Sequence, residues 1–321
     1  MTTSVPCALN MQCQTLRVLQ FNCLCEIYEP SHLHPTLCAF AHGRASRIEA
    51  SIRHVNPDVA CLQEINPAEW FGAKFLADYD ILFGMKGDVA DSFQTPEALR
   101  VLRRTGGRND NDDGAMLMLK RSTVRVLAAK QLSAFEPASR SAPSPVSTFP
   151  ARQFALAAAC EHRTTGKRFV VAGMHMKANR HDHRDVQRVC HASQILPALK
   201  AFRDTTCPGG PIVFAGDFNA QPETATLAYL LGRLPAPLIA PLSFESGMCK
   251  ALGREPDFTF LDSTRHPGVG WSATLDYIML EKGCFAIAGA TKPPEMGSWG
   301  SDALPFVGSD HIPLALDLAF V

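Results

Sequence analysis

The sequence lacks a surplus of either charge, because 31 lysines and arginines are balanced by 31 aspartates and glutamates. A broad basic surface, and with it strong nonspecific binding to duplex nucleic acid, is therefore not predicted. No apolar run approaches the ~18–20 residues of a membrane-spanning helix, and residues 1–15 lack the basic start and apolar core of a secretory signal. The 11 cysteines are odd in number and follow no disulfide framework, which favours a reducing compartment.

These absences bear on the location of the protein and on its chemistry. We expect a cytoplasmic protein without a membrane span. Residues 1–15 contain hydroxyl side chains and no acids, as mitochondrial presequences do, but they are not rich in arginine, so mitochondria are the alternative location. The chain also lacks a P-loop and a Gly-x-Ser-x-Gly motif, which argues against the two enzyme classes that these motifs mark.

The 321 residues are enough for a large core, and no linker divides them. We expect a flexible N-terminus over residues 1–15 and a single domain over residues 16–321. Apolar residues at helical spacing predict helices at residues 43–55, 182–203 and 223–231. Short apolar or alternating segments predict strands at residues 16–22, 59–63, 79–83, 115–119, 124–128, 153–161, 168–175, 212–215, 274–280, 285–290 and 312–320.

The order of these elements predicts an α/β (α+β) fold. Strands dominate, helices lie between them, and no internal repeat is visible, which suits two sheets packed face to face with helices outside. In the first helix Ile48 and Ile52 mark the buried stripe, and we assign Arg44, Arg47 and Arg53 to other faces. Pro197 predicts a kink in the second helix.

Two long polar segments, residues 84–113 and 133–150, are predicted to be loops. The first carries a group of arginines at residues 100–108. Such a group is typical of a solvated loop, and it is also suited to binding phosphates near a cleft.

Polar side chains stand where several predicted strands end or begin. Asn22, Glu64 and His175 follow apolar segments, and Asp217 and Asn219 follow the run at residues 212–215. Each alone is ordinary, since an Asp/Asn pair after a strand is also typical of a turn. Several together are different, because neighbouring strands bring their ends to one edge of a sheet. Two further sites belong to this set: Asp276, and Asp310 with His311.

These residue types indicate phosphate chemistry. Glu64 with Asn22 offers oxygen ligands suited to Mg²⁺, with Mn²⁺ as the other candidate. Asp276 is placed to orient His311, as carboxylates commonly do for imidazoles. His175 and Lys177 can both contact phosphate oxygens. Hydrolysis of a phosphate ester uses such a set: a metal for charge, a base for water, and donors for the oxyanion.

The motifs together resemble the endonuclease/exonuclease/phosphatase superfamily over nearly the whole chain. The resemblance implies a DNase I-like, four-layer α/β/β/α sandwich and Mg²⁺-dependent phosphoester hydrolysis. It rests on Asn22, Gln63-Glu64, His175, Gly216-Asp217-Phe218-Asn219, Leu275-Asp276-Tyr277-Ile278 and Ser309-Asp310-His311.

Within the superfamily the chain is similar to the CCR4/nocturnin-like branch. That branch is linked to 3′–5′ trimming of RNA poly(A) ends and to removal of the 2′-phosphate of NADP(H). The similarity lies in Asp113-Gly114-Ala115-Met116, where the branch usually has a cysteine after the glycine, in Glu255-Pro256-Asp257-Phe258-Thr259 and in His175-Met176-Lys177-Ala178.

The resemblance also implies roles for single residues. Glu64 is expected to bind the metal with Asn22 beside it, and Asp310 to lie near the metal site. Asp217 is expected to orient or deprotonate the attacking water, and Asn219 to hold that geometry. The resemblance does not decide which aspartate or histidine is the formal base.

The remaining roles concern the phosphate. His311, set by Asp276, is expected to stabilise the phosphoryl oxygen or to shuttle a proton. His175 and Lys177 are expected to bind the substrate phosphate.

Two alternatives remain open. One is a phosphatase of another superfamily branch that acts on inositol phosphates or sphingomyelin. The other is a catalytically inactive scaffold that binds RNA or protein. The sequence does not identify protein partners or the oligomeric state.

Overall fold

The computed structural model describes residues 14–25, 43–85, 114–135, 152–178, 182–235, 240–262, 271–291 and 308–321. The predictions for residues 1–13, for the arginine group at residues 100–108, for Asp113 and for most of the second polar loop lie outside the described residues. Among the described residues, no helix is long and apolar enough to cross a membrane.

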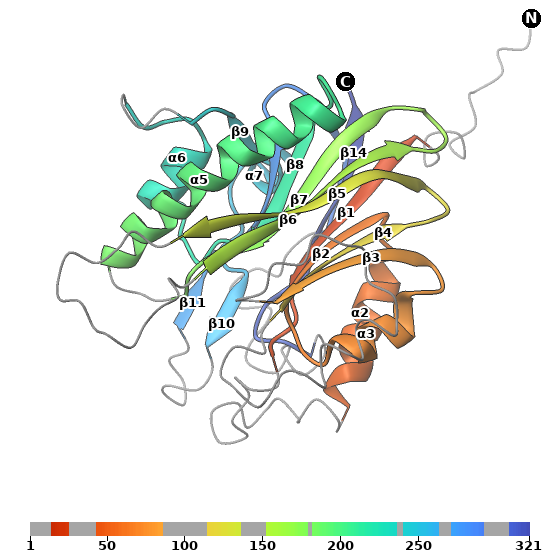
Figure 1. Cartoon of the computed structure of the whole chain (residues 1–321). Coiled ribbons are helices and arrows are strands. Elements are labelled where there is room, and N and C mark those ends of the chain that lie inside the picture. The colour runs from red at the N-terminus through yellow and green to blue at the C-terminus, as the bar shows by residue number, and fades with distance from the viewer. Residues whose placement is uncertain are drawn as a thin grey trace, which may run out of the picture.

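Two six-stranded sheets form the centre of the molecule (Figure 1). The first has the strand order β13-β14-β1-β2-β4-β3. Its strands are β1 (Thr15–Asn22), β2 (Val59–Ile65), β3 (Tyr79–Met85), β4 (Gly114–Lys120), β13 (Phe285–Ala290) and β14 (Leu314–Phe320).

The second sheet has the strand order β5-β6-β7-β8-β12-β9. A separate two-stranded sheet pairs β10 (Phe260–Asp262) with β11 (Trp271–Ala273). The strands of the second large sheet are β5 (Val124–Phe135), β6 (Arg152–His162), β7 (Arg168–His175), β8 (Ile212–Asp217), β9 (Phe244–Ser246) and β12 (Asp276–Glu281).

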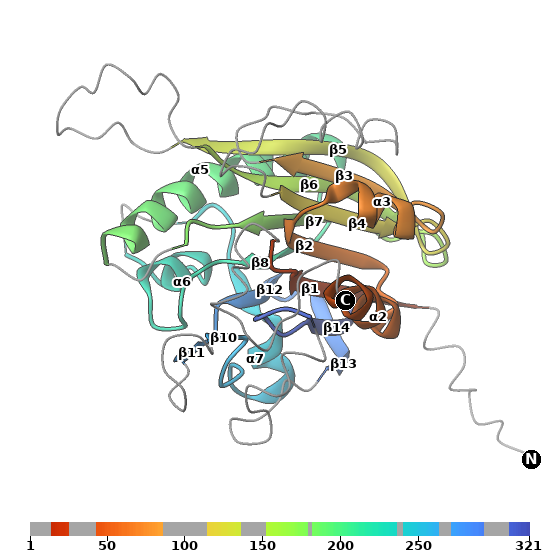
Figure 2. The same ribbon diagram turned by 90° about the horizontal axis from the view of Figure 1, so that it is seen from below.

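Helices cover the outer faces of both sheets (Figure 2). The helices α2 (Arg44–Val55) and α3 (Ala68–Phe75) pack on the first sheet, and α5 (Asp182–Thr206) and α6 (Ala225–Leu230) pack on the second. A third apolar cluster fills the space between the sheets. The short helix α7 (Gly247–Leu252) contacts β12 and β13. The predicted four-layer α/β/β/α sandwich is confirmed.

Alternation along the strands sorts side chains into these layers. In β2, Val59 and Cys61 face the other sheet, whereas Ala60 and Leu62 face α2 and α3. This is the period of two that a strand buried on both faces requires.

Three sequence-based predictions of local structure were wrong or incomplete. Strand β5 continues to Phe135, well past the predicted end at residue 128. The prediction stopped early because a bulge between Val126 and Ala128 shifts the pairing of β5 with β6 and so interrupts the period of two in the sequence. Arg44 is fully buried with Ile48 and Ile52, not on another face of α2. The elements α3, α7 and β9 to β11 have only three to eight residues each, too short to show a clear period.

Candidate active site

The topology brings the polar strand ends to one edge of the sandwich. Strands β1 and β2 are parallel, as are β7 and β8, so Asn22 lies beside Gln63 and His175 lies beside Asp217. Strand β12 is antiparallel to β8 and therefore starts at the same edge, with Asp276 opposite Asp217. Strand β14 is antiparallel to β1 and begins there as well, shortly after His311.

At this edge the layer between the sheets changes from apolar to polar. In β1, Leu16 and Val18 point between the sheets, and Gln20 and Asn22 continue the same face. Strands β7, β8 and β12 place His175, Asp217 and Asp276 on their inner faces in the same way. The site is thus an extension of the central core. Its polar side chains at the strand ends are buried, and only that of Glu64 is partly exposed.

Glu64 reaches the site through a bulge. Strict alternation would turn it toward α2 and α3 with Ala60 and Leu62. Instead the pairing of β2 with β4 shifts between Gln63 and Ile65, and Glu64 has a positive φ of 56°. A bulge of this kind re-aims a side chain, and here it directs the Glu64 carboxylate toward His175 and Asn22.

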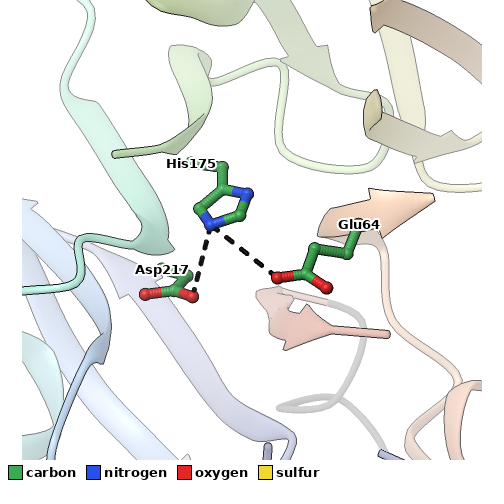
Figure 3. A group of neighbouring side chains, drawn as sticks. All are labelled: Glu64, His175 and Asp217. Carbon is green, nitrogen blue, oxygen red and sulfur yellow. Dashed lines mark ion pairs between the residues drawn. The ribbon is translucent and has the colours of Figure 1, made fainter. Parts of the chain in front are cut away.

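Glu64, His175 and Asp217 form the first of two groups that we distinguish, the Glu64 group (Figure 3). His175 Nε2 lies 3.9 Å from Glu64 Oε1 and 3.6 Å from Asp217 Oδ2. Asn22 Nδ2 donates hydrogen bonds of 3.0 Å to both of these carboxylate oxygens. The backbone N–H of Cys25 donates to the other Glu64 oxygen at 3.0 Å. The two carboxylates are therefore held apart by fixed donors.

Asp217, Asp276 and His311 form the second group, the His311 group. His311 Nδ1 is 2.8 Å from Asp276 Oδ2, and His311 Nε2 is 3.7 Å from Asp217 Oδ2. Burial lowers the pKa of His311, but the charges of Asp276 and Asp217 outweigh it and hold that pKa well above its usual range. These charges favour the protonated imidazole, and Nε2 is the ring nitrogen nearer to Asp217.

Asp217 is shared by the two groups and is almost completely buried. Burial raises its pKa to about 7, even though His311 and the hydrogen bond from Asn22 act to lower it. Its Oδ1 accepts a hydrogen bond of 2.9 Å from the backbone N–H of Asn219. A carboxyl group with a pKa near neutrality is suited to accept or release a proton.

The Glu64 group fits a divalent cation. Its three ligand atoms lie within 4.8 Å of one another. In an octahedral shell with bonds of about 2.1 Å, ligand atoms lie about 3.0 Å apart when adjacent and about 4.2 Å apart when opposite. The separations of 3.6 and 3.9 Å from His175 Nε2 match neither value, so these atoms can share one octahedral shell only after small movements of their side chains. The fit to a divalent cation lies in the donor set, which is two carboxylates and an imidazole.

Three other residues predicted from the sequence lie nearby. Asn219 has a positive φ of 50°, and its side chain donates to the carbonyl of Met176 at 3.1 Å instead of following the direction of Asp217. Lys177 is half-buried, and its ammonium group makes no hydrogen bond or ion pair with the described residues. Asp310 Oδ1 is 4.0 Å from His311 Nε2.

The structure shows supporting residues that the sequence reading missed. Gln20 and Gln63 hydrogen-bond each other, and Gln20 Nε2 donates to Asp276 Oδ1 at 3.2 Å. Thr259 Oγ1 accepts from the backbone N–H of Asp276 at 3.0 Å. Gln20 had a signal in the sequence, because it stands two residues before Asn22 in the same strand and must share its face.

Comparison with known proteins identifies the family. The sequence profile of the endonuclease/exonuclease/phosphatase family matches residues 19–311. The chain belongs to this family. Its members are metal-dependent phosphoesterases or nucleases, and they generally use a divalent metal. None of the curated proteins compared with the chain matches it.

Solved structures of endonuclease/exonuclease/phosphatase proteins share the fold. The human nocturnin catalytic domain with bound sulfate is 20% identical, with a TM-score of 0.66 over 96% of this chain and 95% of that one. ANGEL2, a 2′,3′-cyclic phosphatase, is 17% identical, with a TM-score of 0.71 over 95% of each chain. TDP2 from D. rerio, complexed with a single-strand DNA product, is 16% identical, with a TM-score of 0.57 over 95% of this chain and 98% of that one.

Proposed function

We propose that the protein is a Mg²⁺-dependent phosphoesterase acting on the ribose phosphates of a nucleotide or of an RNA 3′ end. The two candidate reactions are 3′–5′ trimming of poly(A) and removal of the 2′-phosphate of NADP(H). One observation carries the proposal. Asp217 Oδ2 lies 3.0 Å from Asn22 Nδ2, 3.6 Å from His175 Nε2 and 3.7 Å from His311 Nε2. A buried carboxylate among three nitrogen groups is suited to holding a water against a phosphate.

Glu64 is the proposed ligand of the cation. A bound Mg²⁺ would neutralise charge on the phosphate and on the leaving oxygen. Asn22 turns its amide nitrogen toward Glu64 and Asp217, while its Oδ1 accepts from the backbone N–H of Leu24 at 3.0 Å. We therefore favour Asn22 as the residue that orients both carboxylates. That Asn22 binds the cation directly stays a prediction, because the amide would have to rotate by about 180° to turn its Oδ1 toward Glu64 and Asp217.

Asp217 is proposed to accept the proton of the attacking water. The water oxygen bonds to phosphorus, the bond from phosphorus to the leaving ribose oxygen breaks, and the electron pair stays on that oxygen. His311, held by Asp276, donates a hydrogen bond from Nε2 to a phosphoryl oxygen and is proposed to supply the proton that the leaving ribose oxygen takes up. His175 and Lys177 contact the substrate phosphate, and Asn219 fixes Asp217 through its backbone N–H.

The choice of substrate class has two supports. The similar structures include nocturnin with a bound sulfate and ANGEL2 in complex with adenosine-2′,3′-vanadate. The second of these favours one further candidate, a ribose 2′,3′-cyclic phosphate. The net charge of zero favours a small nucleotide or a short single strand over a long duplex.

A substrate panel tests the proposal. Purified protein with Mg²⁺ is incubated with oligo(A), an oligonucleotide ending in a 2′,3′-cyclic phosphate, NADP⁺, NADPH, an inositol phosphate and sphingomyelin. Wild type is compared with Glu64→Gln and with a matched control, Glu161→Gln, because Glu161 pairs with Arg125 and Arg168 at the opposite end of β6 and β7.

We expect hydrolysis of a ribose phosphate by wild type and the control and its loss in Glu64→Gln. Activity on the inositol phosphate or sphingomyelin alone would place the protein in another branch. No activity on any member of the panel would favour the inactive scaffold.

A further inference from the structure

Arg44 contradicts local helix rules. It is the first residue of α2, where a cation opposes the helix dipole, and it is fully buried, which is rare for arginine. The preceding Gly43 has a φ of 111° and supplies no side-chain cap. Local choices this unfavourable are typical of functional positions.

The guanidinium group of Arg44 binds backbone carbonyls from two loops. Its Nη1 donates to the oxygens of Cys23 and Leu24 at 2.7 Å each and to the oxygen of Gly308 at 3.3 Å. The first two carbonyls follow β1, and the third precedes the segment with His311. All three bonds come from Nη1, which carries two N–H groups, so two of the carbonyls share one N–H. Nη1 stands one bond farther from Cα than the ammonium nitrogen of lysine does, so lysine does not place a donor at the same point.

The two peptide groups that Arg44 binds after β1 also donate hydrogen bonds to Asn22 and to Glu64. The Cys23 carbonyl shares its peptide group with the N–H of Leu24, which donates to Asn22 Oδ1 at 3.0 Å. The Leu24 carbonyl shares its peptide group with the N–H of Cys25, which donates to Glu64 Oε2 at 3.0 Å. Each peptide group thus accepts from Arg44 on one side and donates toward the cation site on the other, and such chains polarise one another.

An unfavourable backbone conformation at Leu24 allows Arg44 to bind both carbonyls. Leu24 has a positive φ of 55°, a conformation that is unfavourable for a residue other than glycine. It lets both carbonyls converge on Arg44 while both N–H groups face Asn22 and Glu64. The bonds from Arg44 stabilise this conformation.

The third carbonyl connects Arg44 with the other side of the site. Gly308 precedes Ser309, whose hydroxyl donates to the backbone oxygen of Asn22 at 2.7 Å. The same hydroxyl accepts from the backbone N–H of His311 at 3.1 Å. Arg44 therefore holds the loop after β1 and the loop with His311 at a fixed separation.

We propose that Arg44 is a positioning residue of the active site. Through two consecutive peptide groups it orients Asn22 and Glu64 for cation binding, and through Gly308 it sets their distance from His311. The inference rests on the proposed function in that Glu64 binds the cation. It does not depend on which phosphate ester is the substrate.

Cation affinity in the variant Arg44→Lys tests this proposal without any substrate. Free Mn²⁺ is measured by electron paramagnetic resonance during a titration of wild type, Arg44→Lys and Arg121→Lys. Arg121 is a matched control, because its Nη1 also donates to two loop carbonyls, those of Leu76 and Ala77, at the opposite end of β4.

We expect Arg44→Lys to weaken Mn²⁺ binding by about 10–100-fold, the usual effect of removing support from a metal ligand. Arg121→Lys should bind as wild type does. A folded Arg44→Lys protein, with wild-type circular dichroism, that binds Mn²⁺ as tightly as wild type would overturn the proposal. Where a substrate has been found, kcat should fall with KM nearly unchanged.

A measurement on wild-type protein decides the matter if Arg44→Lys does not fold. In ¹H–¹⁵N spectra, adding Mg²⁺ should shift the amide signals of Leu24 and Cys25 and the guanidinium signals of Arg44, but not those of Arg121. Shifts at Leu24 and Cys25 without a shift at Arg44 would contradict the relay. Mn²⁺ binding that depends on Arg44, together with no activity on the substrate panel, would refute the proposed function and leave this inference standing.

Discussion

Asp217 belongs to two groups of side chains that differ in how tightly their members bind one another. In the Glu64 group, His175 Nε2 stays 3.6 and 3.9 Å from the carboxylate oxygens, beyond hydrogen-bond length. In the His311 group, Nδ1 of His311 is 2.8 Å from Asp276, whose side chain is fully buried. Both imidazoles stay about equally far from Asp217 Oδ2, at 3.6 Å for His175 and 3.7 Å for His311, and the groups differ in that His311 has a closed contact with a second carboxylate.

The difference indicates a division of work. The carboxylates of the Glu64 group are held by Asn22 and the backbone of Cys25, and the Glu64 side chain is 14% exposed, whereas that of Asp276 is fully buried. The His311 group uses its carboxylate to fix the imidazole and keep its proton. The proposed function assigns cation binding to one side of Asp217 and a hydrogen-bond donor to the other.

Replacing the shared residue should have the largest effect. Asp217→Asn removes the group that orients and deprotonates water while keeping its shape. We expect kcat to fall by about 10²–10⁴-fold, as for loss of a general base, with KM changed little. Steady-state kinetics on the substrate identified by the panel measures this.

The control for this variant is Asp317→Asn. Asp317 pairs with Arg17 near the opposite end of β1 and is partly exposed, so its loss should leave kcat unchanged and cost at most about 1 kcal/mol of stability. If Asp217→Asn mainly raised KM, our assignment of Asp217 would be wrong.

Breaking the closed pair should have the next largest effect. Asp276→Asn removes the charge that, together with that of Asp217, opposes the lowering of the His311 pKa by burial. The pKa of His311 should therefore fall, and kcat should fall less than in Asp217→Asn. Imidazole signals followed by NMR across a pH titration measure the pKa. An unchanged His311 pKa would mean that the pair does not hold the proton.

The smallest expected effect concerns the stability of the metal-free protein. The pKa of Asp217 is about 7 in the folded protein against 3.8 for the free side chain, so the folded state binds more protons between these values. Its contribution to the free energy of unfolding therefore falls as pH rises from about 4 to 7. The contribution of His311, whose pKa is raised, is lost only above its usual value of 6.5.

Denaturant unfolding of wild type and of Asp217→Asn, each at pH 4.5 and 6.0, therefore isolates the contribution of Asp217. Wild type should lose stability over this interval relative to Asp217→Asn. Equal changes in the two proteins would show that burial does not raise the Asp217 pKa.

Much of the fold followed from the period of apolar residues. Each predicted strand and each of the two longest predicted helices is present, although β5 is longer than predicted, because each is buried over several residues. The glycine of the Gly216-Asp217-Phe218-Asn219 motif has a structural reason. A Cβ at Gly216 would lie 1.9 Å from the carbonyl oxygen of Met174, so β7 and β8 approach too closely for any other residue. The single domain over residues 16–321 and the cytoplasmic location stay predictions.

The site was less predictable where local rules fail. Glu64 reaches it through a bulge that alternation does not reveal, and Asn219 leaves the direction of Asp217 through a positive φ. Arg44 was assigned to another face although it stands four residues before Ile48, because a buried cation at a helix start contradicts composition rules. Contacts over hundreds of residues, as between Arg44 and Gly308, leave no local signal.

The central claim is that Glu64 binds the cation and that Asp276 and His311 do not. The most direct test is Mn²⁺ binding to metal-free wild type, Glu64→Gln and Asp276→Asn, without substrate, by electron paramagnetic resonance. We predict that Glu64→Gln loses tight binding, whereas Asp276→Asn keeps an affinity close to that of wild type. Tight binding in Glu64→Gln together with its loss in Asp276→Asn would contradict the account.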